Sequence, residues 1–220
     1  EAGPLYSIGC LYGYKDGTAR IFLALHHLIV DTVSWRILTE DLKRLYYGEE
    51  LGAKGSSYRQ WSVTLKNYAR LKEAEKEYWT NVFCDYKEDN SLLSLGLNEG
   101  PGYALDVRLT VEETKKLLGS CNKAYHTEIN DLLLTALSAA LSKLSKNTIH
   151  HIVLEGHGRE EIDLNIDVTG TLGWFTTMYP VRLELQQGIA QSLKHIKETL
   201  RLMPNRGINY GALIGYKHLP

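Results

Sequence analysis

The pattern of apolar and polar positions at the start of the chain predicts a β-hairpin followed by a helix. Residues 5–14 and 19–27 are rich in β-compatible apolar side chains, and the short Lys-Asp-Gly-Thr sequence between them is typical of a turn. From Thr32 onward the apolar positions recur at helical spacing, and Gly48 is placed to end that helix. The chain is therefore expected to change from strand to helix just after residue 27.

The same pattern predicts a mixed order of helices and strands in the rest of the chain. A polar region at 85–102 is the best candidate for a crossing between two lobes. In 127–145 one helical face is apolar and is expected to pack in the core, and it consists of Ile129, Leu132, Leu133, Ala136, Leu137, Ala140, Leu141 and Leu144. The other expected elements are helical segments at 58–83 and 189–203, strands at 103–109, 149–154 and 178–185, a short helix whose capping box starts at Thr110, and a turn at 204–211. This order favours a fold of the mixed α/β class, more specifically an α+β sandwich with two lobes.

Composition excludes several classes of protein. With 220 residues, 44% of them hydrophobic, the chain can bury the core of one domain or of two small ones. A formal net charge of -1 gives no overall attraction to nucleic acid or to an anionic membrane, and the longest apolar runs are too short to span a bilayer. The three cysteines form no CxxC, which favours a reducing, cytoplasmic setting over a disulfide framework. Because the chain starts without methionine, we expect a piece of a longer protein.

Three common catalytic designs do not fit the polar clusters. The histidines at 26, 27, 150, 151 and 157 resemble a pool of metal ligands, but adjacent strand residues point to opposite faces and no compact ligand motif is present, so no metal site is expected. The pair at 150–151 is expected at a strand end, with one side chain inward and one outward. Ser34 lies inside a predicted helix without a G-x-S-x-G elbow, which argues against a serine nucleophile. Gly156 and Gly158 lack the third glycine and the lysine of phosphate-binding loops.

Proton transfer is the chemistry that these clusters favour. His27 at a strand end, followed four residues later by Asp31, is suited to exchange a proton near neutral pH, although a buried structural histidine explains the same pattern. Glu155 also lies at a predicted strand end, beside Gly156, which lets a substrate or another backbone approach closely. Two such groups on opposite sides of a carbon atom are able to remove and return a proton on different faces.

Four motifs give the chain a specific resemblance to a known family. They are HHLIVDTVSW at 26–35, EGHGRE at 155–160, TLGWFTTMYP at 171–180 and PNRGINYG at 204–211. In letters and order they resemble the signatures of the epimerisation domains of nonribosomal peptide synthetases, which are relatives of the condensation domains. The match extends from residue 23 to residue 211.

The resemblance implies an isomerase. It implies that the domain inverts, from L to D, the α-carbon of an aminoacyl or peptidyl group held as a thioester on the phosphopantetheine arm of a carrier protein, with no cofactor bound directly. His27 matches the catalytic histidine of the family, and Glu155 matches its catalytic glutamate. The implied partners are an upstream peptidyl carrier protein domain and neighbouring adenylation and condensation domains, with no nucleic acid and no membrane.

The fold implied by the resemblance is a pair of chloramphenicol-acetyltransferase-like lobes with a tunnel between them. Residues 1–100 are then expected to be the C-terminal part of the first lobe, with His27, and residues 101–220 the N-terminal part of the second lobe, with Glu155. Family members are roughly twice this length, which is consistent with proteins that exceed one core. Both lobes are therefore expected to be incomplete, which puts the activity of the fragment alone in doubt.

The remaining residues of the first motif have supporting roles in this interpretation. Asp31 is expected to orient the histidine loop through a charge or a hydrogen bond, and His26 is expected to turn into the fold. Ser34 is a candidate cap for the helix that starts at Thr32. Trp35 is expected to pack inward from the first helical turn.

The second and third motifs supply further candidates. Arg159, Trp174 and Phe175 are expected to shape the site or the tunnel for the carrier arm. For Arg159 the simplest expectation is a surface salt bridge of little energetic weight with a nearby carboxylate. The neighbouring carboxylates are those of Glu160, Glu161 and Asp163.

Two other functions stay open at this point. A condensation domain uses a similar HHxxxD histidine to join two carrier-bound acyl groups through an amide bond. The EGHGRE motif leans away from that reading, as does Thr32, where condensation domains usually have glycine. A non-catalytic module that only docks a carrier protein is the alternative of another class, and the presence of both His27 and Glu155 speaks against it.

Overall fold

The computed structural model describes residues 3–71, 74–86 and 106–217, which form two units. The first unit contains residues 1–73, 155–178 and 208–220, and the second contains residues 74–154 and 179–207. The predicted lobe boundary at residue 100 and most of the predicted crossing lie outside the described residues. The division into residues 1–100 and 101–220 therefore stays a prediction.

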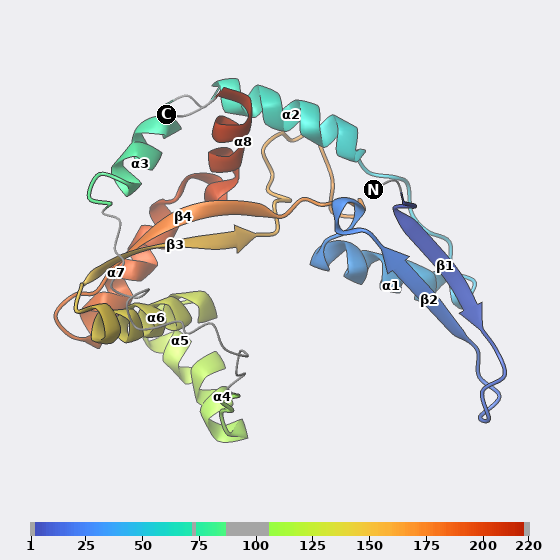
Figure 1. The fold of residues 1–220 in the computed structure, drawn as a ribbon, viewed down its shortest axis with the longest axis horizontal. Coiled ribbons are helices and arrows are strands. Elements are labelled where there is room, and N and C mark those ends of the chain that lie inside the picture. The colour runs from blue at the N-terminus through green and yellow to red at the C-terminus, as the bar shows by residue number, and fades with distance from the viewer. Residues whose placement is uncertain (1–2, 72–73, 87–105, 218–220) are drawn as a thin grey trace. The chain divides into compact units, whose positions relative to one another are not determined.

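The hairpin and the first helix form as predicted. β1 (Tyr6–Leu11) pairs antiparallel with β2 (Arg20–Leu25), as the blue arrows of Figure 1 show. A short 3-10 turn at His27–Ile29 leads into α1 (Thr32–Tyr46). The chain leaves this helix through Gly48, whose φ of 79° favours glycine over other residues. The histidine pair therefore lies between the last strand residue and the first full helical turn.

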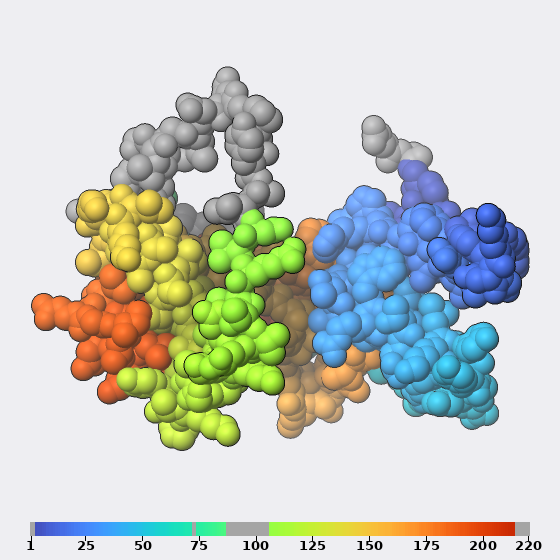
Figure 2. Space-filling view, turned by 90° about the horizontal axis from the view of Figure 1, so that it is seen from below, coloured from blue at the N-terminus to red at the C-terminus, as the bar shows by residue number. Residues whose placement is uncertain are grey.

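The core of the first unit lies away from the hairpin. Every residue of both hairpin strands is exposed or half-buried, and their side chains form the dark blue surface in Figure 2. Apolar burial instead occurs where α2 (Tyr58–Leu71) packs against α8 (Ile208–Lys217). The buried core residues are Trp61, Tyr68, Val168, Phe175 and Ile208. This core joins α2 and α8 to the loop that carries the third motif.

The fourth motif contains a helix start that the sequence pattern did not predict. A turn was expected over 204–211, but the turn occupies only Pro204–Gly207, and α8 begins at Ile208. Asn205 and Arg206 both have left-handed backbone angles, which reverse the chain within four residues. Ile208, Ala212 and Leu213 are then buried at helical spacing. Within the motif only Ile208 belongs to this apolar stripe, so the motif sequence by itself did not predict a helix.

Among the described residues, the second unit is mostly helical and contains the greater part of two paired strands. β3 (Ile149–Gly156) pairs with β4 (Thr177–Glu184), and the amide of Leu185 donates to the carbonyl of Thr148, so the end of β4 lies beside the start of β3. The helices are α3 (Glu75–Val82), α4 (Val111–Leu118), α5 (Ser120–Tyr125), α6 (Ile129–Ser145) and α7 (Ile189–Leu202). The predicted capping box at Thr110 is confirmed by its reciprocal bonds with Glu113. Residues 106–109 are not part of a strand.

The predicted core face of α6 is wrong. Leu133, Leu137 and Leu144 are all exposed, whereas the buried residues are Asp131, Leu134, Thr135, Ser138 and Ser145. For Thr135 and Ser145, nearby groups satisfy the hydrogen bonds of the buried hydroxyl. The Thr135 hydroxyl donates to the Asp131 carbonyl, and the Ser145 hydroxyl bonds the His150 ring. The neighbouring element in contact with α6 is α7.

The histidines at 150 and 151 have structural partners in the second unit. His150 is buried, and its Nε2 lies 2.8 Å from the Ser145 hydroxyl. His151 bonds the Val82 carbonyl at 2.8 Å and lies 3.4 Å from Asp85. Since the side chain of His151 is only 10% exposed, the expectation of one inward and one outward histidine is wrong.

Candidate active site

The two histidines of the first motif have different surroundings. His26 is exposed, and its Nδ1 accepts a hydrogen bond from the amide of Leu28, so it caps the 3-10 turn. The prediction that His26 turns into the fold is therefore wrong, because the chain turns sharply at this residue. His27 is also exposed, and its ring lies 5.4 Å from the ring of Trp174 at an interplanar angle of 63°. This is an edge-to-face contact between the first and third motifs.

Asp31 is the cap of α1. Its Oδ1 accepts a hydrogen bond from the amide of Ser34 at 2.7 Å, which is the usual geometry of an aspartate N-cap. Ser34 lies inside the helix instead of capping it, so that prediction is wrong. The neighbouring Trp35 is half-buried on the first turn.

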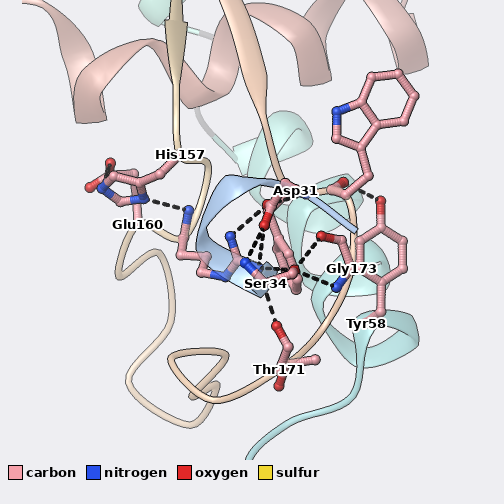
Figure 3. Close-up of polar contacts among 10 residues, drawn as sticks. Asp31, Ser34, Tyr58, His157, Glu160, Thr171 and Gly173 are labelled. Atoms are coloured by element: carbon pink, nitrogen blue, oxygen red, sulfur yellow. Dashed lines mark hydrogen bonds and ion pairs between the residues drawn. The ribbon is translucent and has the colours of Figure 1, made fainter. Parts of the chain in front are cut away.

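Arg159 forms a buried, bidentate ion pair with Asp31. Its Nη1 lies 2.6 Å from Asp31 Oδ2, and its Nη2 lies 3.1 Å from Oδ1 (Figure 3). The side chains are only 5% and 3% exposed, respectively. The expectation of a surface salt bridge with Glu160, Glu161 or Asp163 is therefore wrong. Those carboxylates can stay hydrated at little cost, whereas a buried carboxylate requires a partner.

The Arg159 guanidinium also binds groups other than Asp31. Nη2 donates to the Ser34 hydroxyl at 2.9 Å and to the Thr171 carbonyl at 3.2 Å. The guanidinium carbon lies 4.1 Å from the centre of the Phe175 ring. Planar guanidinium groups favour such combined stacking and bidentate contacts. Arg159 therefore connects α1, its own loop and the third motif.

The same contacts hold Asp31 in its charged form. Burial by itself raises the pKa of Asp31, but hydrogen bonds from Arg159, from both Ser34 groups and from the Phe175 amide outweigh burial. Together they lower the pKa of this carboxyl to about 2. Asp31 is thus a permanently charged structural group near neutral pH and is unsuited to proton transfer.

The segment Gly173-Trp174-Phe175 is held at every residue by its backbone. The Ser34 hydroxyl donates to the Gly173 carbonyl at 2.9 Å and accepts from the Gly173 amide at 3.0 Å. The Tyr58 hydroxyl donates to the Trp174 carbonyl at 2.8 Å, and the Phe175 amide donates to Asp31 at 3.1 Å (Figure 3). Phe175 is buried, while Trp174 is 43% exposed. The backbone contacts therefore fix the base of an exposed indole.

Gly158 explains why the second motif requires a glycine beside Arg159. A Cβ atom at this residue would lie 1.7 Å from the Phe175 carbonyl oxygen, and the φ of Gly158 is 67°. Both the space and the backbone angle therefore exclude other side chains. This close approach places the second motif directly against the third.

Glu155 lies near the end of β3 and is exposed. Within the described residues, no side chain or backbone amide binds its carboxylate. The loop after it is ordered by local bonds, since His157 Nδ1 accepts from the Arg159 amide and His157 Nε2 lies 3.2 Å from Glu160. Glu155 and His27 belong to the same unit. Each lies four residues before one member of the Asp31 and Arg159 ion pair.

Tyr58 is the residue of this site that sequence reasoning missed. It is the first residue of α2, and its hydroxyl binds a backbone carbonyl 116 residues away. The sequence around a tyrosine at the start of an amphipathic helix does not indicate whether its hydroxyl bonds a distant residue. Only the fold brings it to the third motif.

Three further features bear on function, namely metal-binding clusters, cysteines and membrane-spanning helices. In the part of the chain that the structure describes, no group of three histidine, cysteine or acidic side chains is arranged to hold a metal ion. Cys10, Cys84 and Cys121 are exposed and unpaired with one another. The described helices include none with the length and apolar character needed to cross a membrane.

Comparison with known proteins identifies the family. The family model of the condensation domain matches residues 1–220. The chain is 43% identical over 215 residues to N-(5-amino-5-carboxypentanoyl)-L-cysteinyl-D-valine synthase of Amycolatopsis lactamdurans, covering 97% of this chain and 6% of that protein. It is 41% identical over 225 residues to gramicidin S synthase 1 of Brevibacillus brevis, covering 96% of this chain and 20% of that protein. The chain thus spans a small part of these relatives.

Solved structures agree with this result. The epimerization domain from the third module of tyrocidine synthetase B matches with a TM-score of 0.79 and 35% identity, over 97% of this chain and 51% of that one. The first condensation domain of the calcium-dependent antibiotic synthetase has a TM-score of 0.64 and 20% identity, over 98% and 49% of the two chains, and at that identity shows the fold alone. The expected chloramphenicol-acetyltransferase-like fold is therefore confirmed, as part of a domain. The chain belongs to the condensation-domain family of nonribosomal peptide synthetases.

Proposed function

We propose that this domain inverts the α-carbon of an aminoacyl or peptidyl group held as a thioester on the phosphopantetheine arm of a carrier protein. The observation that carries the proposal is the buried ion pair between Asp31 and Arg159. It joins the segment that bears His27 to the segment that bears Glu155. The 35% identity to an epimerization domain supports the same reaction.

The chemistry requires two groups that exchange protons with one carbon atom. The α-proton beside a thioester is weakly acidic, so its removal needs a positioned base and stabilisation of the enolate-like charge. Glu155 is the proposed base, since its carboxylate is exposed and binds no described residue. His27 is the proposed partner, which returns a proton on the other face or, when protonated, stabilises the enolate. Asp31 and Arg159 hold these groups in place and transfer no proton themselves.

The substrate class determines the proposed partners. A thioester on a phosphopantetheine arm arrives with a peptidyl carrier protein domain, and the amino acid is loaded by an adenylation domain. The multidomain synthases that resemble this chain support such a setting. No cofactor beyond the substrate's own arm is needed for a proton to leave and return.

The test follows α-proton exchange in the natural full-length chain. A loaded carrier is placed in heavy water, and deuterium at the α-carbon is measured by mass spectrometry after release of the thioester. Glu155→Gln is expected to abolish the exchange, because the amide cannot accept the proton at neutral pH. Glu161→Gln, an exposed glutamate of the same loop, is the matched control and is expected to leave the rate unchanged. Undiminished exchange in Glu155→Gln would remove the basis for the proposal.

Condensation is the second candidate function. The family model and the structural match to a condensation domain favour it, because both domain types have this fold. A condensation domain forms an amide between two carrier-bound acyl groups. Formation of that amide by the same full-length chain, in the absence of α-proton exchange, would select condensation over epimerisation.

A further inference from the structure

We propose that Tyr58 is a positioning residue for His27. Its hydroxyl holds the backbone of Trp174, and the indole of Trp174 in turn holds the imidazole ring of His27. The role of this contact in catalysis rests on the proposed function, whereas the contact itself can be tested without any activity. Tyr58 would then act on the reaction through Trp174, without touching the substrate.

The first step of the argument is the surroundings of His27. The ring is exposed, and no described side chain or backbone group makes a hydrogen bond to it. Its ring contact is the edge of Trp174, 5.4 Å between centroids. An exposed imidazole without a hydrogen bond rotates freely unless a neighbour limits it. Trp174 is therefore the group that restricts the orientation of this ring.

The second step is the control of Trp174. Because Trp174 is 43% exposed, packing alone does not fix its indole. Ser34 holds Gly173 on one side and Asp31 holds Phe175 on the other, both through backbone atoms. The Trp174 carbonyl belongs to the same peptide group as the Phe175 amide, and it accepts a second hydrogen bond to that group from Tyr58. Tyr58 thus completes the set of backbone bonds that fixes the base from which the indole projects toward His27.

The third step is the fit of Tyr58 itself. A Cβ atom on Gly173 would lie 2.5 Å from Tyr58 Cδ2, so the tyrosine ring packs directly over the glycine. The same ring contacts Phe175 edge to face at 5.0 Å. The start of α2 is fixed by the Ser57 carbonyl, which accepts from the amide of Trp61 in the core. Tyr58 is therefore held at its base and at its ring, which gives its hydroxyl a defined direction.

The test measures the reactivity of His27 against that of His26 in the natural full-length chain. Diethyl pyrocarbonate modifies exposed imidazoles, and cleavage after Arg20 and Arg36 gives one peptide with both histidines. Fragmentation between them in the mass spectrometer gives the ratio of the two modifications. His26 is the internal reference, because it is exposed and, among the described residues, makes no hydrogen bond or ring contact with Trp174 or Tyr58.

Three variants test the hydroxyl of Tyr58 and the indole ring of Trp174 separately. Tyr58→Phe keeps the ring packing and removes the hydrogen bond, and it is expected to raise the ratio of His27 to His26 modification by about fivefold, the effect of one ordinary hydrogen bond. Trp174→Ala is expected to raise it further, and Trp174→Phe to raise it less than Trp174→Ala. Tyr47→Phe, an exposed tyrosine of the same unit, is the matched control and should leave the ratio unchanged. A ratio unchanged in Tyr58→Phe would overturn the proposal, whatever the result for Trp174→Ala.

Exchange kinetics give the second readout. For Tyr58→Phe we expect kcat for α-proton exchange to fall about fivefold with KM unchanged, because the thioester still binds but the histidine is less often aligned. A rise in KM at constant kcat would mean that Tyr58 binds substrate and does not position His27. If the unmodified chain shows no exchange at all, the proposed function fails, and the modification ratio alone still decides the role of Tyr58.

Discussion

Asp31 and Arg159 are 128 residues apart in the chain, yet their side chains form a buried bidentate ion pair with Nη1 2.6 Å from Oδ2. The pair joins two loops that each carry a candidate acid or base four residues earlier. A bidentate contact fixes both distance and angle, which a single hydrogen bond does not. The two loops are therefore expected to respond together to any change in either charged residue.

Asp31→Asn is expected to destabilise the first unit by about 3 to 5 kcal/mol, because Arg159 is left buried without a counter-charge. Asparagine is also a good N-cap, so the helix start is retained and the effect reports the lost charge. Hydrogen exchange of the amides in 171–176, followed by mass spectrometry in the full-length chain, measures this opening. Glu40→Gln on the exposed side of α1 is the control. Equal protection in the two variants would contradict the structural role of the pair.

Acid is expected to weaken the same contacts between about pH 4 and pH 2. The folded-state pKa of Asp31 is about 2, below the value near 4 of an unfolded aspartate. A lowered folded-state pKa gives stability that is present above the unfolded value and is lost as the pH falls through the folded value. The difference of about two pKa units corresponds to roughly 2.5 kcal/mol. Amide exchange in 171–176 at stepped pH, corrected for intrinsic rates, should show this loss, and Asp31→Asn should lack it.

Gly158→Ala is expected to disrupt the contact between the second and third motifs. The added methyl group would meet the Phe175 carbonyl oxygen at 1.7 Å, and the left-handed backbone angle adds strain of about 1 to 3 kcal/mol. Gly170→Ala is the matched control in the same segment, since nothing lies within 4 Å of its Cβ position. Thermal unfolding of the two variants, monitored by limited proteolysis, gives the comparison. If Gly158→Ala is as stable as Gly170→Ala, the close approach of Gly158 to the Phe175 carbonyl oxygen does not exist in the protein.

Local features of the fold could be predicted from the sequence. The hairpin turn, the end of the first helix at Gly48 and the capping box at Thr110 depend on residues within four positions of one another. Their physical causes are turn propensity, left-handed backbone angles and reciprocal capping bonds. The motifs also identified His27 and Glu155 as candidates, and the structure places both in one unit. Their catalytic roles stay predictions.

Distant partners could not be predicted in the same way. Arg159 has three acidic neighbours in sequence, so only the burial of Asp31 explains why it pairs across 128 residues. Tyr58 gave no signal, because its partner is a backbone carbonyl and backbone acceptors are the same at every residue. The buried face of α6 was predicted wrongly because the spacing of apolar residues does not indicate which hydroxyls bond within the helix. Such hydroxyls, as in Thr135 and Ser145, can be buried. The errors at Arg159 and Tyr58 share one cause, namely hydrogen bonds between groups that lie far apart in the sequence.

The anchoring of residues 173–175 has a consequence for redesign of the domain. Ser34, Tyr58 and Asp31 bind peptide groups of this segment, and peptide groups do not change when a side chain is replaced. The path of the loop is therefore expected to survive replacement of the Trp174 side chain, so a smaller side chain there removes the ring contact with His27 while the backbone of 173–175 stays in place. Substitutions at position 174 therefore test the indole by itself, separately from the path of the loop.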